Sequence, residues 1–188
     1  MRAAAISPDF ATNLVTLIRR HRPGLIVEAG SGVSTLIAAS CLREVGQGRI
    51  LSLEQEERYA RLPTEYLEDH GLADVARVVH APLRSVALGP RTWEWYDTTA
   101  LAKFAPIDVL IVDGPLQHGQ ARRLVRYPAL PLIVETLSPG AVVVLDDGSR
   151  EDEAIVLGRW LHEFVALDVE RIPSEKGTVV LRRNGCRG

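Results

Sequence analysis

Short β-branched runs alternate with helix-periodic segments along the whole chain, and this alternation constrains the fold more than any other feature. The segments that are typical of strands are 25–30, 49–55, 75–81, 107–114, 141–148, 164–172 and 178–183. Amphipathic segments separate most of them, as in strand–helix–strand units that build a parallel sheet. The sequence therefore predicts an α/β fold with a doubly wound sheet of seven strands.

The predicted helices have recognisable ends. Ser7 and Pro8 form an N-cap and first helical residue, and Pro23-Gly24 ends the opening helix. The later helices are 31–46, 56–71 with a kink or break near Pro63, a segment up to Leu137 interrupted by Pro128 and Pro131, and about 150–163. Residues 82–103 are predicted to be a long connection. The turn PSEKG joins the last two strands as a hairpin, so the closing strand should run antiparallel to the others.

Length and composition bound the organisation and the partners. The 188 residues suit one domain, with an N-terminal helix in 1–24 and the core in 25–183. With 22 Lys+Arg against 24 Asp+Glu, there is no basic excess for nucleic acid. No segment resembles a signal peptide or membrane helix, so a soluble protein is expected. Two cysteines, Cys41 and Cys186, fit a reducing cytoplasm.

The stretch VEAGSGVST (27–35) joins a strand, a Gly-rich turn and a helix. Gly30 and Gly32 allow a tight turn and close approach of a ligand, although an ordinary strand-to-helix turn is the alternative. Glu28 would repel a pyrophosphate, and Thr35 takes the third glycine position of the dinucleotide pattern. A carboxylate instead attracts the sulfonium and ammonium of S-adenosylmethionine (SAM). The turn therefore favours SAM over NAD.

Glu54 ends the second predicted strand, at the place from which a carboxylate accepts hydrogen bonds from both ribose hydroxyls. Both SAM and NAD carry this ribose, so Glu54 supports a nucleoside cofactor without choosing between them. The alternative is that Glu54 lies favourably at the positive end of the following helix.

With these residues in place, the chain resembles the class I SAM-dependent methyltransferases from Leu25 to Arg183. The resemblance implies a Rossmann-like fold with one antiparallel strand. EAGSG (28–32) is similar to the family's first motif, HAPL (80–83) to the segment that flanks adenine, and IVDG (111–114) to the motif of the fourth strand. The cofactor-binding residues that it implies are Glu28, Gly30, Ser31, Gly32, Glu54, Ala81, Pro82, Leu83 and Asp113.

Asp113, Asp146 and Asp147 end two neighbouring predicted strands and should project into one crevice. Hard oxygen ligands suit Mg²⁺, which would bind substrate oxygens and acidify a hydroxyl. The arrangement is similar to metal-dependent O-methyltransferases of the catechol and macrolide-sugar types, which implies that these three residues are metal ligands. The alternative role is capping of the next helix by Asp147 or Ser149.

The chain departs from the catechol-type pattern at Leu116, where those enzymes carry a lysine as the base. His118 is the nearest group that takes up a proton near neutral pH. Asp113 and His118 are therefore the predicted catalytic residues.

Two further groups have competing interpretations. Trp93, Trp95 and Tyr96 are expected to cover the sheet edge, with stacking on adenine or an aromatic acceptor as the alternative. Three arginines (Arg122, Arg123 and Arg126) are expected on a solvated helix face, with binding of an acidic acceptor as the alternative.

The predicted function is SAM-dependent methyl transfer to a small molecule, with oxygen as the acceptor atom. An inactive SAM-binding scaffold protein remains an alternative because of Leu116, and an NAD-dependent oxidoreductase is a second. Nucleic acid and membranes are not expected as partners. A homodimer through Trp160, Phe164 and the terminal hairpin is left open.

Overall fold

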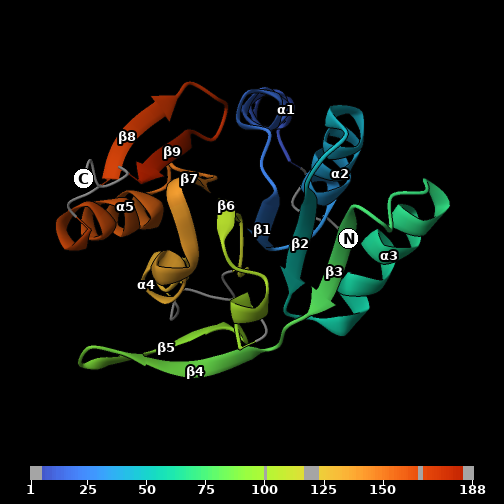
Figure 1. Ribbon diagram of the computed structural model, residues 1–188. Helices are drawn as coiled ribbons and strands as arrows, with labels where there is room; N and C mark the ends of the chain where they lie inside the picture. The colour runs from blue at the N-terminus through green and yellow to red at the C-terminus, as the bar shows by residue number, and fades with distance from the viewer. Residues whose placement is uncertain (1–5, 100, 117–122, 165–166, 184–188) are drawn as a thin grey trace.

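Seven strands form one sheet in the order β3-β2-β1-β6-β7-β9-β8 (Figure 1). The computed structural model describes residues 6–99, 101–116, 123–164 and 167–183. The strands are β1 (Leu25–Ala29), β2 (Arg49–Glu54), β3 (Ala76–His80), β6 (Ile107–Val112), β7 (Leu137–Leu145), β8 (Leu167–Ile172) and β9 (Thr178–Arg183). β9 is antiparallel to both of its neighbours, while the other four pairings are parallel. The predicted seven-stranded α/β fold with an antiparallel closing strand is confirmed.

Helices cover both faces of this sheet. The helical elements are α1 (Pro8–His21), α2 (Val33–Val45), α3 (Glu57–Asp69), α4 (Ala129–Ile133) and α5 (Glu151–Glu163), with short 3₁₀ turns η1 (Leu101–Lys103) and η2 (Val134–Thr136). The first three pack on one face and α4 and α5 on the other, so the sheet is buried on both sides. Its central strands are accordingly rich in apolar residues. Within the described residues, no helix is both long and apolar enough to cross a bilayer.

Two expectations about the helices differ from the structure. α3 continues through Pro63 as one helix, so the predicted break is absent. α5 has Arg150 as its N-cap residue and no side-chain cap, so neither Asp147 nor Ser149 has the capping role considered from the sequence. Instead, Asp147 has a positive φ of 56° and lies in the turn that precedes the helix.

Residues 82–103, predicted as a long connection, contain an antiparallel hairpin. β4 (Leu83–Leu88) pairs with β5 (Arg91–Tyr96) in a separate sheet that crosses the lower part of Figure 1. Trp95 and Tyr96 are buried with the cluster that also holds α4 and α5. The hairpin therefore packs on the sheet face that α4 and α5 cover. The two aromatic residues have the expected covering role, but on a face of the sheet instead of its edge.

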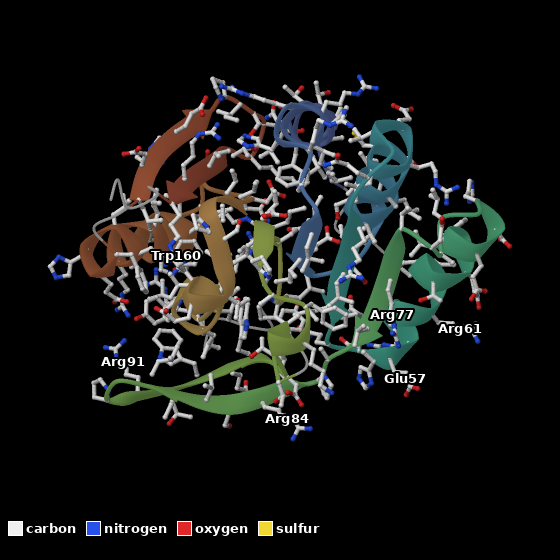
Figure 2. All side chains as sticks on the ribbon, viewed as in Figure 1. Glu57, Arg61, Arg77, Arg84, Arg91 and Trp160 are labelled. Carbon is white, nitrogen blue, oxygen red and sulfur yellow. The ribbon has the colours of Figure 1, made fainter. Side chains whose placement is uncertain are left out.

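Trp160 shows how α5 is fixed to this face. Its side chain is fully buried, and its Nε1 donates a hydrogen bond of 2.9 Å to the carbonyl oxygen of Tyr127. In Figure 2 it lies within the molecule, whereas Arg61 and Arg84 lie at the outer surface. Trp160 thus packs internally, and the homodimer stays a prediction.

The turn into β2 requires a glycine at position 48. Its φ is +87°, and a Cβ there would overlap the carbonyl oxygen of Pro23. Gly48→Ala should lower the free energy of unfolding by about 2 kcal/mol or more, because the left-handed conformation alone costs roughly 1–2 kcal/mol. Gly158→Ala is the matched control: it lies in α5 with open space around its Cβ, and should stabilise by about 0.5–1 kcal/mol. Urea unfolding of both variants measures the difference, and equal effects would contradict the prediction.

Candidate functional site

The turn after β1 is stabilised by hydrogen bonds that involve Glu28. Its carboxylate is fully buried, and Oε2 accepts hydrogen bonds from Thr35 Oγ1 at 2.6 Å and from Ser52 Oγ at 2.5 Å. Thr35 Oγ1 in turn accepts the backbone N–H of Gly32 at 3.1 Å. Thr35, which departs from the dinucleotide pattern, therefore links the buried carboxylate to the Gly-rich turn at the start of α2.

One oxygen of Glu28 is left without a partner. Oε1 is buried and has no hydrogen-bond partner among the described residues. Burial raises the pKa of Glu28, and hydrogen bonds from hydroxyl groups partly offset this shift. A buried carboxylate with a free oxygen lowers its energy when a donor or cation approaches.

Glu54 lies at the neighbouring strand end, as predicted. Its Oε2 accepts a hydrogen bond from Ser31 Oγ at 2.9 Å, and its Oε1 accepts the backbone N–H of Glu56 at 3.0 Å. Its backbone carbonyl accepts the N–H of Ala81 at 2.7 Å. The structure therefore brings together the turn, Glu54 and the start of the 81–83 segment, in which Pro82 is exposed.

The turns after β1 and β6 approach each other closely. The backbone N–H groups of Asp113 and Gly114 both donate to the carbonyl oxygen of Ala29, at 3.1 and 2.7 Å. Gly30 adopts a φ of +107°, and a Cβ at Gly30 would lie 3.4 Å from Gly114 N. The Gly-rich turn and Asp113 consequently share one edge, which we call the carboxyl edge: the ends of β1, β2, β6 and β7.

Tyr96 also lies at this edge, whereas the sequence predicted that it covers the sheet edge or, alternatively, stacks on adenine or an aromatic acceptor. It ends β5, and a Cβ on Gly114 would overlap its hydroxyl oxygen. Burial raises the pKa of Tyr96, and the charges of Glu54, Asp113 and Glu28 contribute in the same direction. The alternating runs LRSVAL and RTWEWY around Gly89-Pro90 are the hairpin signal that places it there.

The three aspartates converge as predicted. One carboxylate oxygen each of Asp113, Asp146 and Asp147 lies within 4.8 Å of the others. Asp146 and Asp147 are buried, while the Asp113 side chain is 28% exposed. The Oδ1 atoms of Asp146 and Asp147 have no hydrogen-bond partner among the described residues.

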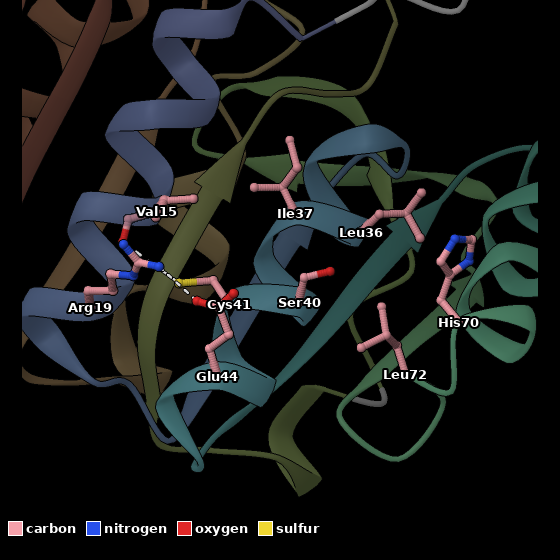
Figure 3. Close-up of a pocket in the computed structure, with 9 residues that line it drawn as sticks. All are labelled: Val15, Arg19, Leu36, Ile37, Ser40, Cys41, Glu44, His70 and Leu72. Atoms are coloured by element: carbon pink, nitrogen blue, oxygen red, sulfur yellow. Dashed lines mark hydrogen bonds and ion pairs between the residues drawn. The ribbon is translucent and has the colours of Figure 1, made fainter.

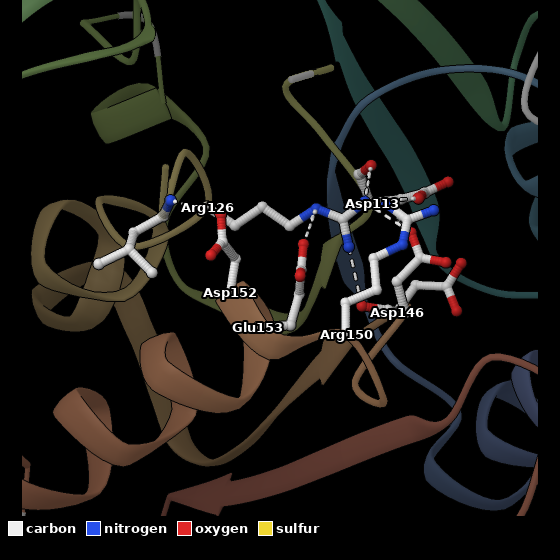
Figure 4. Close-up of polar contacts among 8 residues, drawn as sticks. Asp113, Arg126, Asp146, Arg150, Asp152 and Glu153 are labelled. Carbon is white, nitrogen blue, oxygen red and sulfur yellow. Dashed lines mark hydrogen bonds and ion pairs between the residues drawn. The ribbon is translucent and has the colours of Figure 1, made fainter. Parts of the chain in front are cut away.

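Arg126 does not lie on a solvated face as expected; it lies buried among these carboxylates (Figure 4). Its Nη2 contacts Asp147 Oδ2 at 3.0 Å and Asp113 Oδ1 at 3.3 Å, and its Nε lies 3.6 Å from Glu153 Oε1. Arg123, in contrast, is half exposed and pairs with Asp152 at 2.6 Å. The solvated-face prediction is wrong for Arg126, because tertiary packing carries it inward, and Arg122 lies outside the described residues.

Of the two predicted catalytic residues, the structure describes Asp113 and not His118. Asp113 lies at the carboxyl edge, and burial raises its pKa to about 7, with Arg126 opposing the shift. His118 lies outside the described residues, so its prediction stays open. Leu116, the residue found where a lysine was expected, is 50% exposed.

A cavity of about 390 Å³ opens between the hairpin and the segment after β6. Its lining residues are Leu83, Arg91, Thr92, Trp93, Glu94, Pro115, Leu116, Arg123, Leu124 and Val125. Trp93 packs against Tyr127 with ring centroids 4.6 Å apart. The cavity thus combines an aromatic and apolar wall with charged side chains at its rim, and Pro115 and Leu116 connect it to Asp113.

A second hollow, of about 340 Å³, lies between α1, α2 and the turn after α3 (Figure 3). Val15, Leu36 and Cys41 line it, and the ion pair between Arg19 and Glu44, 2.7 Å long, borders it. None of the predicted site residues contributes to this lining, so it is separate from the carboxyl edge.

Comparison with solved structures shows the same fold in methyltransferases. A methyltransferase from Geobacter sulfurreducens is 16% identical, with a TM-score of 0.70 over 96% of this chain and 80% of that chain. Cofactor-bound Rv0187 from MTB is 21% identical, with a TM-score of 0.73 over 98% of this chain and 84% of that chain. An O-methyltransferase from Bacillus cereus, in complex with SAH, is 17% identical, with a TM-score of 0.71 over 97% of this chain and 84% of that chain. At these identities the likeness establishes the fold.

The sequence itself shows the family. No curated protein is significantly similar in sequence. The profile of a family described as "Methyltransferase domain" matches residues 27–148, which include the Gly-rich turn, Glu54 and all three aspartates. This match confirms the resemblance inferred from the sequence motifs, and the chain belongs to this methyltransferase-domain family.

Proposed function

We propose that the protein transfers a methyl group from SAM to a hydroxyl oxygen of a small molecule. The observation that carries this proposal is the convergence of the Gly-rich turn, Glu28, Glu54 and Asp113 at one edge of the sheet. Crevices at the carboxyl ends of parallel strands are where open α/β sheets bind ligands. The family match supplies the chemistry, methyl transfer.

The residues at this edge fit SAM. The unpartnered Glu28 Oε1 provides buried negative charge beneath the turn, which suits a ligand carrying a sulfonium and an ammonium. Glu54, already oriented by Ser31 and Glu56, keeps lone pairs for ribose hydroxyls. A Cβ built on Gly32 meets nothing within 4 Å, so the backbone at the start of α2 faces open space. In this proposal Ala81, Pro82 and Leu83 flank the adenine.

The acceptor would occupy the cavity between the hairpin and the segment after β6. Its volume of about 390 Å³ suits a small molecule, and Trp93 offers a flat apolar wall. Arg91 and Arg123 at its rim favour an acceptor that carries negative charge, although Arg123 already pairs with Asp152.

The chemistry requires alignment of the acceptor and removal of its proton. When bound, SAM supplies the electrophilic methyl carbon. Asp113 is the proposed base, because it lies beside the turn and is the most exposed of the three aspartates. Tyr96, whose buried hydroxyl lies beside Gly114, would help to exclude water there. In the two alternatives that remain, the same turn would hold SAM without catalysis or would hold NAD.

Ligand titration tests this proposal directly. Calorimetry should show binding of SAM and S-adenosylhomocysteine, with NADH binding at least about tenfold more weakly, because the Glu28 carboxylate would repel its pyrophosphate. A screen of aromatic and acidic hydroxyl compounds should then yield S-adenosylhomocysteine as product. SAM binding without turnover across the panel would favour the scaffold alternative, and preferential NADH binding would refute the methyl-donor site.

A further inference from the structure

Arg126 is held at the end of two strands by backbone as well as side-chain contacts. Nη1 donates to the carbonyl oxygen of Asp146 at 2.8 Å, and Nη2 donates to that of Asp113 at 2.7 Å. The side chain is 5% exposed. Two strands and the first turn of α5, through Glu153, therefore fix the guanidinium in place (Figure 4).

Two of the three carboxylates that could hold a metal face this guanidinium. Asp113 Oδ1 and Asp147 Oδ2 both contact Nη2, and both residues belong to the set whose oxygens converge within 4.8 Å. Mg²⁺ would lie about 2.0–2.1 Å from each ligand oxygen and keep several waters. A metal bound by these two oxygens would lie next to the guanidinium and meet a fixed positive charge. The donor set suits Mg²⁺, but the fixed charge beside it does not.

We propose that Arg126 is the resident cation of this acidic cluster and that the protein binds no divalent metal there. Arg126 ties Asp113 to Asp147 and thereby positions Asp113 at the carboxyl edge. Its hydrogen bonds to the two backbone carbonyls do not depend on the carboxylate charges, so a metal would not displace it by competing for carboxylates alone. The unpartnered Oδ1 atoms of Asp146 and Asp147 offer a rival site beside Arg126.

The test measures metal binding and needs no methyl transfer, so its outcome is independent of the proposed function. Metal-free wild-type protein is titrated with Mn²⁺, and the free ion is followed by electron paramagnetic resonance. We expect no binding tighter than about 1 mM. Arg126→Met should gain one Mn²⁺ site, at least about tenfold tighter than any wild-type binding. Its Tm should rise with Mg²⁺, whereas the wild-type Tm should not.

Arg150→Gln is the matched control. Arg150 pairs with Asp147 at 3.0 Å, the same distance as Arg126, but its side chain is 58% exposed. This variant should bind no Mn²⁺, and neither should Arg126→Lys, which keeps a charge. Adding Asp146→Asn to Arg126→Met should abolish the gained site.

Two results would overturn the proposal. One is stoichiometric Mn²⁺ binding by the wild-type protein that Asp146→Asn abolishes, which would establish the rival site. The other is a folded Arg126→Met variant that binds no Mn²⁺. If Arg126→Met does not fold, the wild-type titration still decides, because Mn²⁺ binding by the wild-type protein that depends on Asp146 contradicts a resident arginine cation.

Discussion

Replacing Glu28 by Gln is expected to weaken SAM binding by about 10- to 100-fold. The attraction between a carboxylate and a ligand cation at an effective dielectric constant near 20 amounts to a few kcal/mol. Each 1.4 kcal/mol of binding free energy changes the affinity about tenfold. Gln still offers an oxygen to Thr35, whose hydrogen bond holds the Gly-rich turn. The variant therefore removes the charge while retaining the support of the turn.

Comparison of two ligands isolates the charge effect. S-adenosylhomocysteine lacks the sulfonium charge, so Glu28→Gln should weaken its binding less than that of SAM. Calorimetry at pH 8 is appropriate because burial raises the pKa of Glu28 above its usual range. Glu44→Gln, at an exposed ion pair with Arg19, is the control and should change neither affinity. Equal losses for both ligands would show that Glu28 does not act on the sulfonium charge.

Local sequence signals predicted the parts of the site that lie on consecutive elements. EAGSG predicts a turn between a buried strand and a helix, and the structure places Glu28 and Gly30 there. Strand ends in a parallel sheet share an edge, so the convergence of the three aspartates also followed from topology. These features depend on strand order and periodicity, which the sequence encodes directly.

The β4–β5 hairpin and the burial of Arg126 did not follow from local sequence signals. The hairpin was missed because a connection between parallel strands is usually helical, although its alternation and its Gly89-Pro90 turn were visible. The sequence around Arg126 does not indicate whether its side chain faces solvent or the sheet. Its burial depends on contacts with Asp113 and Asp147 from distant strands, and no local pattern encodes them.

Replacing Asp113 by Asn is expected to lower kcat by about 10²- to 10⁴-fold, the usual contribution of a positioned base. Asn has nearly the same shape and keeps an oxygen for the 3.3 Å contact with Arg126, so SAM affinity should change by less than about tenfold. Single-turnover measurement with an acceptor from the screen gives the rate, and titration gives the affinity. A variant with wild-type kcat would exclude Asp113 as the base.

The pH dependence supplies an independent check on Asp113. Burial raises its pKa to about 7; Asp146, Glu28 and Asp147 act in the same direction, and Arg126 opposes it. A base must be deprotonated, so wild-type kcat should rise as pH increases through about 7, and this rise should vanish in Asp113→Asn.

The same pKa shift makes the free energy of unfolding change with pH in the opposite direction to kcat. The folded state binds more protons than the unfolded state between pH of about 4 and about 7, so the free energy of unfolding should fall as pH rises across this window. Asp113→Asn should flatten that fall in urea unfolding, a readout that needs neither cofactor nor acceptor. An unchanged slope would mean that Asp113 titrates as an ordinary surface carboxyl, which is too acidic to accept a hydroxyl proton efficiently near neutral pH.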